Sequence, residues 1–319
     1  MTDLLQSFFT VAILALFAAA ARPATGQATP PVLPEASPLM PSIQPILDFR
    51  TSDIKFNLQA LMKVLRDRNH EDWMLAAYPD PNTGRPLIGA GFSLDVAATD
   101  HQQWDPLNPN QFLEPSSAQL WQAAGLDPEK LRQILEEFNA GLEARGTKGY
   151  RRRLRAHTLR PQITDEEATR LLRITAIQAV INARAYCRNF DRLDGPQQMA
   201  LSQLAFQMGV NLEKFVEFLS ELNGDSSHPD LLQPDGGGVT DAQHSKNVQN
   251  TLFDSQWARR YTVRAITVIA MFDPGYASNP RAAEAKMMVA LPPPVRHRHR
   301  NSSTRRSSKA NNHSARSSH

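Results

Sequence analysis

The sequence predicts a mainly α-helical fold with one small β-hairpin, and three observations lead to this prediction. Apolar residues recur at helical spacing over most of the chain between residues 52 and 272. Helix-capping residues begin several of these stretches, and glycines end two of them. Extended character is confined to residues 75–94, where a turn-rich stretch separates two short apolar runs.

The first predicted helix begins near Ser52 and has Glu71 at its C-terminal end. Its apolar stripe follows one helix face and consists of Ile54, Leu58, Leu61, Met62 and Leu65. Later helices are predicted after Ser116 or Ser117, after Asp127 with Pro128, and after Thr164, which forms a capping box with Glu167. Gly209 and Gly224 are predicted to end two more, and residues 245–272 to form one or two others.

The predicted hairpin is the only strand content expected. Its turn, PDPNTGRP, contains Asp, Pro, Asn and Gly, which supply turn-specific backbone angles. Gly89 and Gly91 follow, and their missing side chains are expected to let the backbone approach a ligand or the facing strand closely. Asp80 is therefore placed in a turn directly after a short strand.

The chain of 319 residues divides by composition into four parts. Residues 1–27 contain a short apolar run followed by small residues, as in a secretory signal peptide, so we expect export to the periplasm or the extracellular space. Because the first residues lack Lys and Arg, an uncleaved signal anchor that tethers the protein to a membrane is the alternative. Residues 28–45 form a proline-rich linker, residues 46–290 the folded domain, and residues 291–319 a disordered basic tail.

The positive charge of the protein is concentrated in that tail. It holds seven Lys or Arg and no Asp or Glu, so the rest of the chain has a net charge of −4 although the whole chain has +3. This argues against a specific nucleic-acid binder, and an exported tail would instead contact anionic wall or membrane polymers. The single cysteine, Cys187, excludes an intrachain disulfide and is predicted to be a buried, unreactive thiol.

Two carboxylates are the strongest candidates for chemistry, because the sequence lacks metal-ligand, nucleophile and phosphate-loop motifs and implies no metal or cofactor. Glu71 ends a helix, and Asp80 lies nine residues later in a turn. Cleavage of a glycosidic bond needs one protonated carboxyl and a second group that stabilises charge or activates water. The alternative is that the two acids are a solvated helix end and a turn cap.

Four stretches, in order along residues 52–277, resemble the phage-type lysozymes. They are the acidic corner from Glu71 through Asp80 to IGAG, then ITDEEATRLL, then ALSQLAFQMG, and last SQWARRYTVRAITVIAMF. The resemblance implies a two-lobe fold with a cleft between the lobes, and cleavage of peptidoglycan at muramic acid. The segment of about residues 96–162 is an insertion relative to that family, and we expect it to add two helices.

The resemblance also implies roles for particular residues. Glu71 matches the general acid, Asp80 the second catalytic carboxylate, and Arg264 the arginine that pairs with the acid. Phe206 and Gln207 match the part of the core helix that lines the sugar cleft, although plain core packing is the alternative for Phe206.

The sequence departs from the family at two positions. Leu87 replaces a threonine whose hydroxyl helps to place the attacking water, and Phe92 replaces a histidine. One extra residue also lies between Asp80 and Gly84, with Asn82 and Thr83 as partial substitutes for the missing hydroxyl. A lytic transglycosylase, which needs no added water, and a non-catalytic wall-binding protein are therefore alternatives. Residues 148–160 hold six basic residues and no acid, so they either contact an anionic glycan or form a solvated face.

Overall fold

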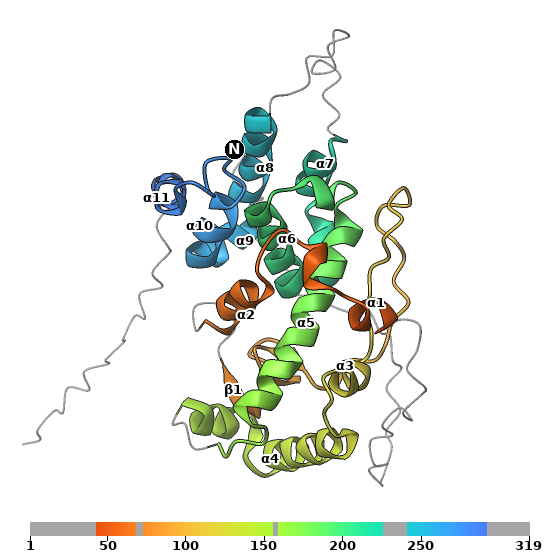
Figure 1. Cartoon of the computed structure of the whole chain (residues 1–319). Helices are drawn as coiled ribbons and strands as arrows, with labels where there is room; N and C mark the ends of the chain where they lie inside the picture. Colours follow the sequence, from red (N-terminus) through yellow and green to blue (C-terminus); the bar gives the residue numbers. More distant parts are fainter. Residues whose placement is uncertain (1–42, 68–72, 156–158, 226–240, 292–319) are drawn as a thin grey trace, which may run out of the picture. The chain divides into compact units, whose positions relative to one another are not determined.

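The computed structural model describes residues 43–67, 73–155, 159–225 and 241–291 (Figure 1). Within them the chain is mainly helical with a small antiparallel sheet, which confirms the predicted fold class. The helices are α1 (Gln44–Leu47), α2 (Leu58–Arg66), α3 (Ser117–Ala123), α4 (Pro128–Arg155), α5 (Asp165–Tyr186), α6 (Gly195–Met208), α7 (Val216–Asn223), α8 (Asp241–Phe253), α9 (Gln256–Arg260), α10 (Thr262–Ala270) and α11 (Pro280–Ala290). Short 3-10 helices are η2 (Thr51–Asp53), η3 (Phe190–Arg192) and η4 (Gly209–Lys214).

Helix boundaries follow the predicted capping residues in the middle of the chain. The Thr164 hydroxyl accepts a hydrogen bond from the Glu167 N–H at 3.1 Å, and the Glu167 carboxylate accepts one from the Thr164 N–H at 2.7 Å. Ser116 caps α3 through the N–H of Gln119 at 3.2 Å. Gly209 and Gly224 end α6 and α7 with φ of 50° and 72°, angles that suit glycine.

The N-terminal part of the domain differs from the prediction. Helix α2 begins at Leu58 and not near Ser52, because the Asn57 side chain caps it by accepting the Gln59 N–H at 2.7 Å. It ends at Arg66, because Asp67 has an extended backbone, so the prediction that Glu71 ends this helix is wrong. Ile54 is buried nonetheless, so its place in the apolar stripe reflects burial in a non-helical segment. Helical structure also begins within the expected linker, since α1 starts at Gln44.

The C-terminal part contains more helices than predicted. Residues 245–272 contribute to three helices, α8, α9 and α10, where one or two were expected. Ser255 separates the first two, because its hydroxyl caps α9 by accepting the Ala258 N–H at 3.1 Å. Helix α11 follows and packs on α10, although the apolar spacing did not indicate it.

The sheet is antiparallel with the strand order β1 (Met74–Pro79), β2 (Pro86–Gly89), β3 (Phe92–Ser93). Tyr78 pairs with Leu87, and Leu87 pairs in turn with Ser93, so the predicted hairpin carries one additional short strand. A Cβ at Gly89 would meet no atom of the described chain within 4 Å, so close approach to the facing strand is not the reason for this glycine. The physical reason is its φ of 63°, which a side chain would disfavour.

Helix α5 runs through the middle of the described structure (Figure 1) and contacts α1, α2, α3, α6 and β2. It contributes to two hydrophobic cores. The small core packs β1 and β2 against α3, α4 and the start of α5, and includes Ile88, Trp121, Phe138 and Leu171. The large core continues from Leu172 along α5 and includes residues of α2, α6, α7, α8 and α10. Trp73, Phe92 and Ile174 pack against both cores.

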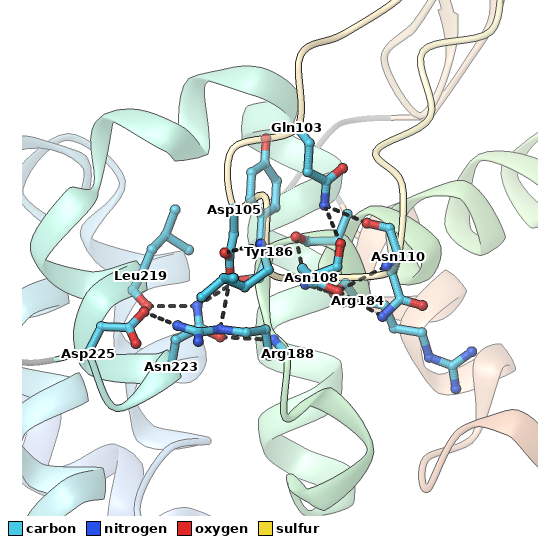
Figure 2. Close-up of polar contacts among 12 residues, drawn as sticks. Gln103, Asp105, Asn108, Asn110, Arg184, Tyr186, Arg188, Leu219, Asn223 and Asp225 are labelled. Atoms are coloured by element: carbon cyan, nitrogen blue, oxygen red, sulfur yellow. Dashed lines mark hydrogen bonds and ion pairs between the residues drawn. The ribbon is translucent and has the colours of Figure 1, made fainter.

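The inserted segment contains the two expected helices, α3 and α4, preceded by a long loop. Figure 2 shows how this loop is held on the C-terminal end of α5. The Asn108 amide donates to the carbonyl oxygens of Arg184 and Ala185 at 2.8 and 2.9 Å, and Arg188 forms an ion pair with Asp105 at 2.8 Å. The loop therefore has a defined position against α5.

Several predictions concern residues outside those that the structure describes. These are Glu71, the signal peptide, most of the linker, and the basic tail beyond Leu291. Among the described helices, none is long and apolar enough to cross a membrane.

Candidate functional site

A groove of about 220 Å³ lies beside the sheet. Its walls come from β3 and the residues around it, the inserted segment, α5 and α6. Three aromatic side chains line it: Phe112, which is buried, and Phe92 and Phe206, which are half-buried. Apolar walls with a few polar groups are typical of sites that bind small molecules or polymer segments.

The inserted segment supplies one wall of this groove, and amide side chains of α5 hold it. The Asn182 side chain accepts the Leu113 N–H at 2.8 Å and donates to the Leu113 carbonyl at 3.0 Å. Gln178 donates to the same carbonyl at 3.0 Å. These bonds place Glu114, the next residue, whose carboxyl is the only ionisable group among the described residues that line the groove.

Glu114 belongs to a chain of three side chains. The His101 Nδ1 lies 3.6 Å from Glu114 Oε2, and its Nε2 lies 2.6 Å from Glu213 Oε1 in η4. The imidazole also packs on Phe112, with ring centroids 5.1 Å apart. No group of His, Cys, Asp or Glu in the described part of the chain is arranged to hold a metal ion.

Burial raises the pKa of the Glu114 carboxyl, and the nearby Glu213 carboxylate raises it further, while His101 lowers it. The net direction is upward, so Glu114 keeps its proton to a higher pH than an exposed glutamate. A protonated carboxyl can donate a hydrogen bond to a hydroxyl or a glycosidic oxygen, which a carboxylate cannot. Glu114 thus has chemical properties useful in sugar binding.

Asp80 caps the hairpin turn. Its Oδ1 accepts the N–H groups of Asn82 and Thr83 at 2.7 and 2.6 Å, and its backbone N–H donates to the Arg85 carbonyl oxygen at 2.8 Å. The half-buried carboxylate is therefore held in one orientation by the backbone. The Thr83 hydroxyl accepts the Arg85 N–H at 3.3 Å, so it also contributes to the turn.

Phe206 and Gln207 are adjacent on α6 and have different surroundings. Phe206 lines the groove, so cleft lining and core packing both describe it, since its ring also packs against the large core. The Gln207 side chain accepts the Trp257 Nε1–H at 3.1 Å, which ties α6 to α9. Gln207 is not among the lining residues of the groove.

Arg264 lies on α10, which packs on α6, and only 5% of it is exposed. Its guanidinium carbon is 5.7 Å from the centre of the Tyr261 ring. Burial of a guanidinium is costly unless acids or acceptors compensate for the lost water. The pairing of Arg264 with Glu71 stays a prediction, because Glu71 lies outside the described residues.

Among the residues predicted for the site, the groove includes Phe206, while Asp80, Gln207 and Arg264 lie elsewhere in the described structure. Glu71 falls in residues 68–72, which the structure does not describe. Sequence reasoning missed Glu114 and its partners His101 and Glu213. No local pattern could have found them, because 112 residues separate His101 from Glu213 and only the fold brings them together.

No protein-family model matches the chain, and no curated protein or solved structure matches it either.

Proposed function

We propose that the protein is exported and cleaves the glycan strands of peptidoglycan as a lysozyme-type glycoside hydrolase. The observation that carries this proposal is the groove, which combines aromatic walls with the carboxyl of Glu114. Sugars present apolar ring faces and many hydroxyls, so aromatic rings and a hydrogen-bonding carboxyl suit them together. Phe206, which lines the groove, belongs to one of the stretches that resemble phage-type lysozymes.

Each proposed catalytic residue has a distinct task. Glu71 protonates the leaving oxygen, and Arg264 orients Glu71 and balances its charge. Asp80 stabilises positive charge on the sugar or holds water, and the two backbone N–H groups on its Oδ1 support this role by limiting its motion. No metal or organic cofactor is part of the proposed mechanism.

A transglycosylase is the second candidate, and Leu87 favours it. This residue is half-buried in β2 between Tyr78 and Ser93, and its aliphatic side chain cannot bind a water molecule. A lytic transglycosylase closes the sugar on its own hydroxyl, so it needs a general acid but no added water. Glu71 would serve as that acid in either reaction.

Digestion of purified sacculi by the full chain tests the proposal. Mass spectrometry of the released fragments is expected to show reducing ends, which indicate hydrolysis. Anhydro ends would indicate transglycosylation instead. Retention of the protein on sacculi without any cleavage would refute catalysis and support a non-catalytic wall-binding protein.

Two substitutions test the proposed catalytic roles of Glu71 and Asp80. Glu71→Gln is expected to lower the rate by at least about a hundredfold, because it removes the transferable proton. Asp80→Asn keeps the side-chain oxygen that accepts the turn N–H groups, so a loss of rate there reports the missing charge and not a broken turn. Glu166→Gln, at an exposed position of α5, is the matched control and should leave the rate unchanged.

Glu114→Gln separates sugar binding from catalysis. A role in the groove predicts weaker binding of glycan fragments by about tenfold with little change in the rate at saturation. Unchanged affinity in this variant would remove Glu114 from the binding site. The basic tail would add affinity for anionic wall or membrane polymers, which deletion of residues 292–319 tests.

A further inference from the structure

A second cavity, of about 400 Å³, lies within the inserted segment. Helix α4 reverses direction at Gly146, whose φ of 61° and ψ of 166° are not helical. Its second half therefore folds back on the first, with the Tyr150 ring 5.4 Å from that of Phe138. The stretch of residues 159–162, here called the closing stretch, also lines the cavity.

The walls of this cavity are fixed parts of the fold. Tyr150 is only 6% exposed, and its hydroxyl donates to the Ala77 carbonyl of β1 at 3.0 Å. A Cβ at Gly141 would lie 2.8 Å from the Tyr150 ring, so a glycine is needed where the two halves meet. Gln162 accepts the Ala77 N–H at 2.7 Å and donates to Glu137 at 2.7 Å.

The charges around the cavity are strongly unequal. Four cationic side chains line it, and they come from both halves of α4 and from the closing stretch: Lys130, Arg145, Arg153 and Arg160. Glu137 is the only acid among the described lining residues, and it already accepts the Gln162 amide. Lys130 forms an ion pair with Glu167 at 2.7 Å, so its charge is compensated within the fold. Arg145 and Arg160 are the two exposed arginines of the lining.

We propose that this cavity binds a phosphate group through Arg145 and Arg160. Guanidinium groups present planar, paired N–H donors that match the oxygens of phosphate, and charge-assisted hydrogen bonds of this kind are strong. The phosphate is either free or carried on a lipid headgroup. The proposal is independent of glycan cleavage, because the cavity and the groove have no lining residue in common.

The inserted segment offers a matched control, since not all its basic residues face the cavity. Lys148 and Arg152 are exposed residues of the same half-helix and are not among the lining residues. Arg145→Gln with Arg160→Gln therefore removes two charges from the cavity, and Lys148→Gln with Arg152→Gln removes two charges beside it. The two double variants have the same net charge and so the same long-range electrostatic attraction.

Titration calorimetry of the full chain with inorganic phosphate, at constant ionic strength, tests the proposal. We expect saturable binding that the Arg145 and Arg160 double variant weakens by at least about tenfold, and the control variant by less than about twofold. Equal weakening in both variants would show attraction to general positive charge and overturn the proposal. Absence of saturable binding would overturn it as well.

Vesicles distinguish the two sources of phosphate. Phosphatidylcholine vesicles with and without phosphatidylglycerol are mixed with the same proteins, and bound protein is measured by sedimentation. Binding that requires phosphatidylglycerol, depends on Arg145 and Arg160, and falls when inorganic phosphate is added supports a lipid headgroup. Saturable binding of inorganic phosphate alone supports a free phosphate compound. If the double variant does not fold, Arg160→Gln from the non-helical closing stretch replaces it in both measurements.

Discussion

Glu167 has two structural tasks in one side chain. It completes the capping box of α5 with Thr164, and it forms an ion pair with Lys130 of α4. Burial disfavours its ionised form, but the Lys130 ammonium and the Thr164 N–H outweigh burial, so its pKa is lowered. A lowered pKa means that the carboxylate stabilises the folded state at neutral pH, and that this stabilisation is lost as the pH falls through the folded-state pKa.

Glu167→Ala is therefore expected to lower the free energy of unfolding by about 1 to 2 kcal/mol at pH 7, since it removes a cap bond and a partly buried ion pair. The difference in unfolding free energy between this variant and the unmodified protein should shrink as the pH falls below the ordinary pKa of glutamate. Urea unfolding at several pH values measures it. Glu166→Ala, in the same helix turn but exposed, is the control, and an equal loss in that variant would contradict the assignment.

Cys187 illustrates how burial controls reactivity. The prediction of a buried thiol is confirmed, because its exposed fraction is 0%. Burial raises the pKa of the thiol to about 12, although the Asn189 N–H and Arg188 oppose the shift. The thiolate is the reactive form, so the folded protein should react very slowly with thiol reagents.

We expect a disulfide reagent at pH 8 to label Cys187 only after urea is added, as read from the mass of the intact protein. The raised pKa also implies that stability falls as the pH rises from the ordinary cysteine pKa toward 12, because the unfolded chain releases this proton first. Labelling of the folded protein at the rate of a free thiol would contradict the burial.

At the scale of elements, the inserted loop caps the C-terminal end of α5. The last carbonyl groups of a helix lack partners within it, and Asn108 donates to two of them, those of Arg184 and Ala185. Asn108 is buried, whereas Asn110, which donates to Asn108 Oδ1 at 3.0 Å, is exposed. The pair allows a comparison of two similar substitutions at different depths.

Asn108→Ala should cost about 2 to 3 kcal/mol of unfolding free energy, because it removes the buried hydrogen bond to the Ala185 carbonyl and one of the two donors to the Arg184 carbonyl, which also accepts the Cys187 N–H. Asn110→Ala should cost less than about 1 kcal/mol. Thermal unfolding followed by circular dichroism measures both. Equal costs would mean that the loop does not stabilise the end of α5.

Elements whose signals are local could be predicted from sequence. Thr164 with Glu167, and Gly209 after α6, act within a few residues of the helix ends that they define. The predicted start of α2 was wrong because Ile54 fits the spacing of a helical apolar stripe, although it is buried in a non-helical segment. Helix α9 was missed because it has only five residues, and α11, with 11 residues, was missed because its position depends on packing against α10.

The site was less predictable than the fold for the same physical reason. Phe206 could be named because the stretch around it resembles a known helix. Glu114 could not, because its position depends on amides of α5 that bind Leu113 and on His101, which is held by Glu213. Contacts between distant parts of a chain leave no periodic pattern in the sequence.

At the scale of the whole molecule, α5 joins the two cores without a break. Leu171 belongs to the small core and Leu172 to the large core, and they are neighbours in the first half of one helix of 22 residues. Separate unfolding of the small core would require α5 to end between these two residues. That would remove helical hydrogen bonds and also expose side chains that pack against both cores, such as Ile174.

We therefore expect the two cores to unfold in one transition. Trp121 is fully buried in the small core and Trp257 lies in the large core, so variants that retain one of the four tryptophans report each core separately. Their fluorescence midpoints in urea should coincide. Phe138→Ala, in the small core, should cost about 3 to 5 kcal/mol and move both midpoints equally. A shift of the Trp121 midpoint alone, with Trp257 unaffected, would show that the small core unfolds independently, whereas Glu136→Ala on the exposed side of α4 should move neither.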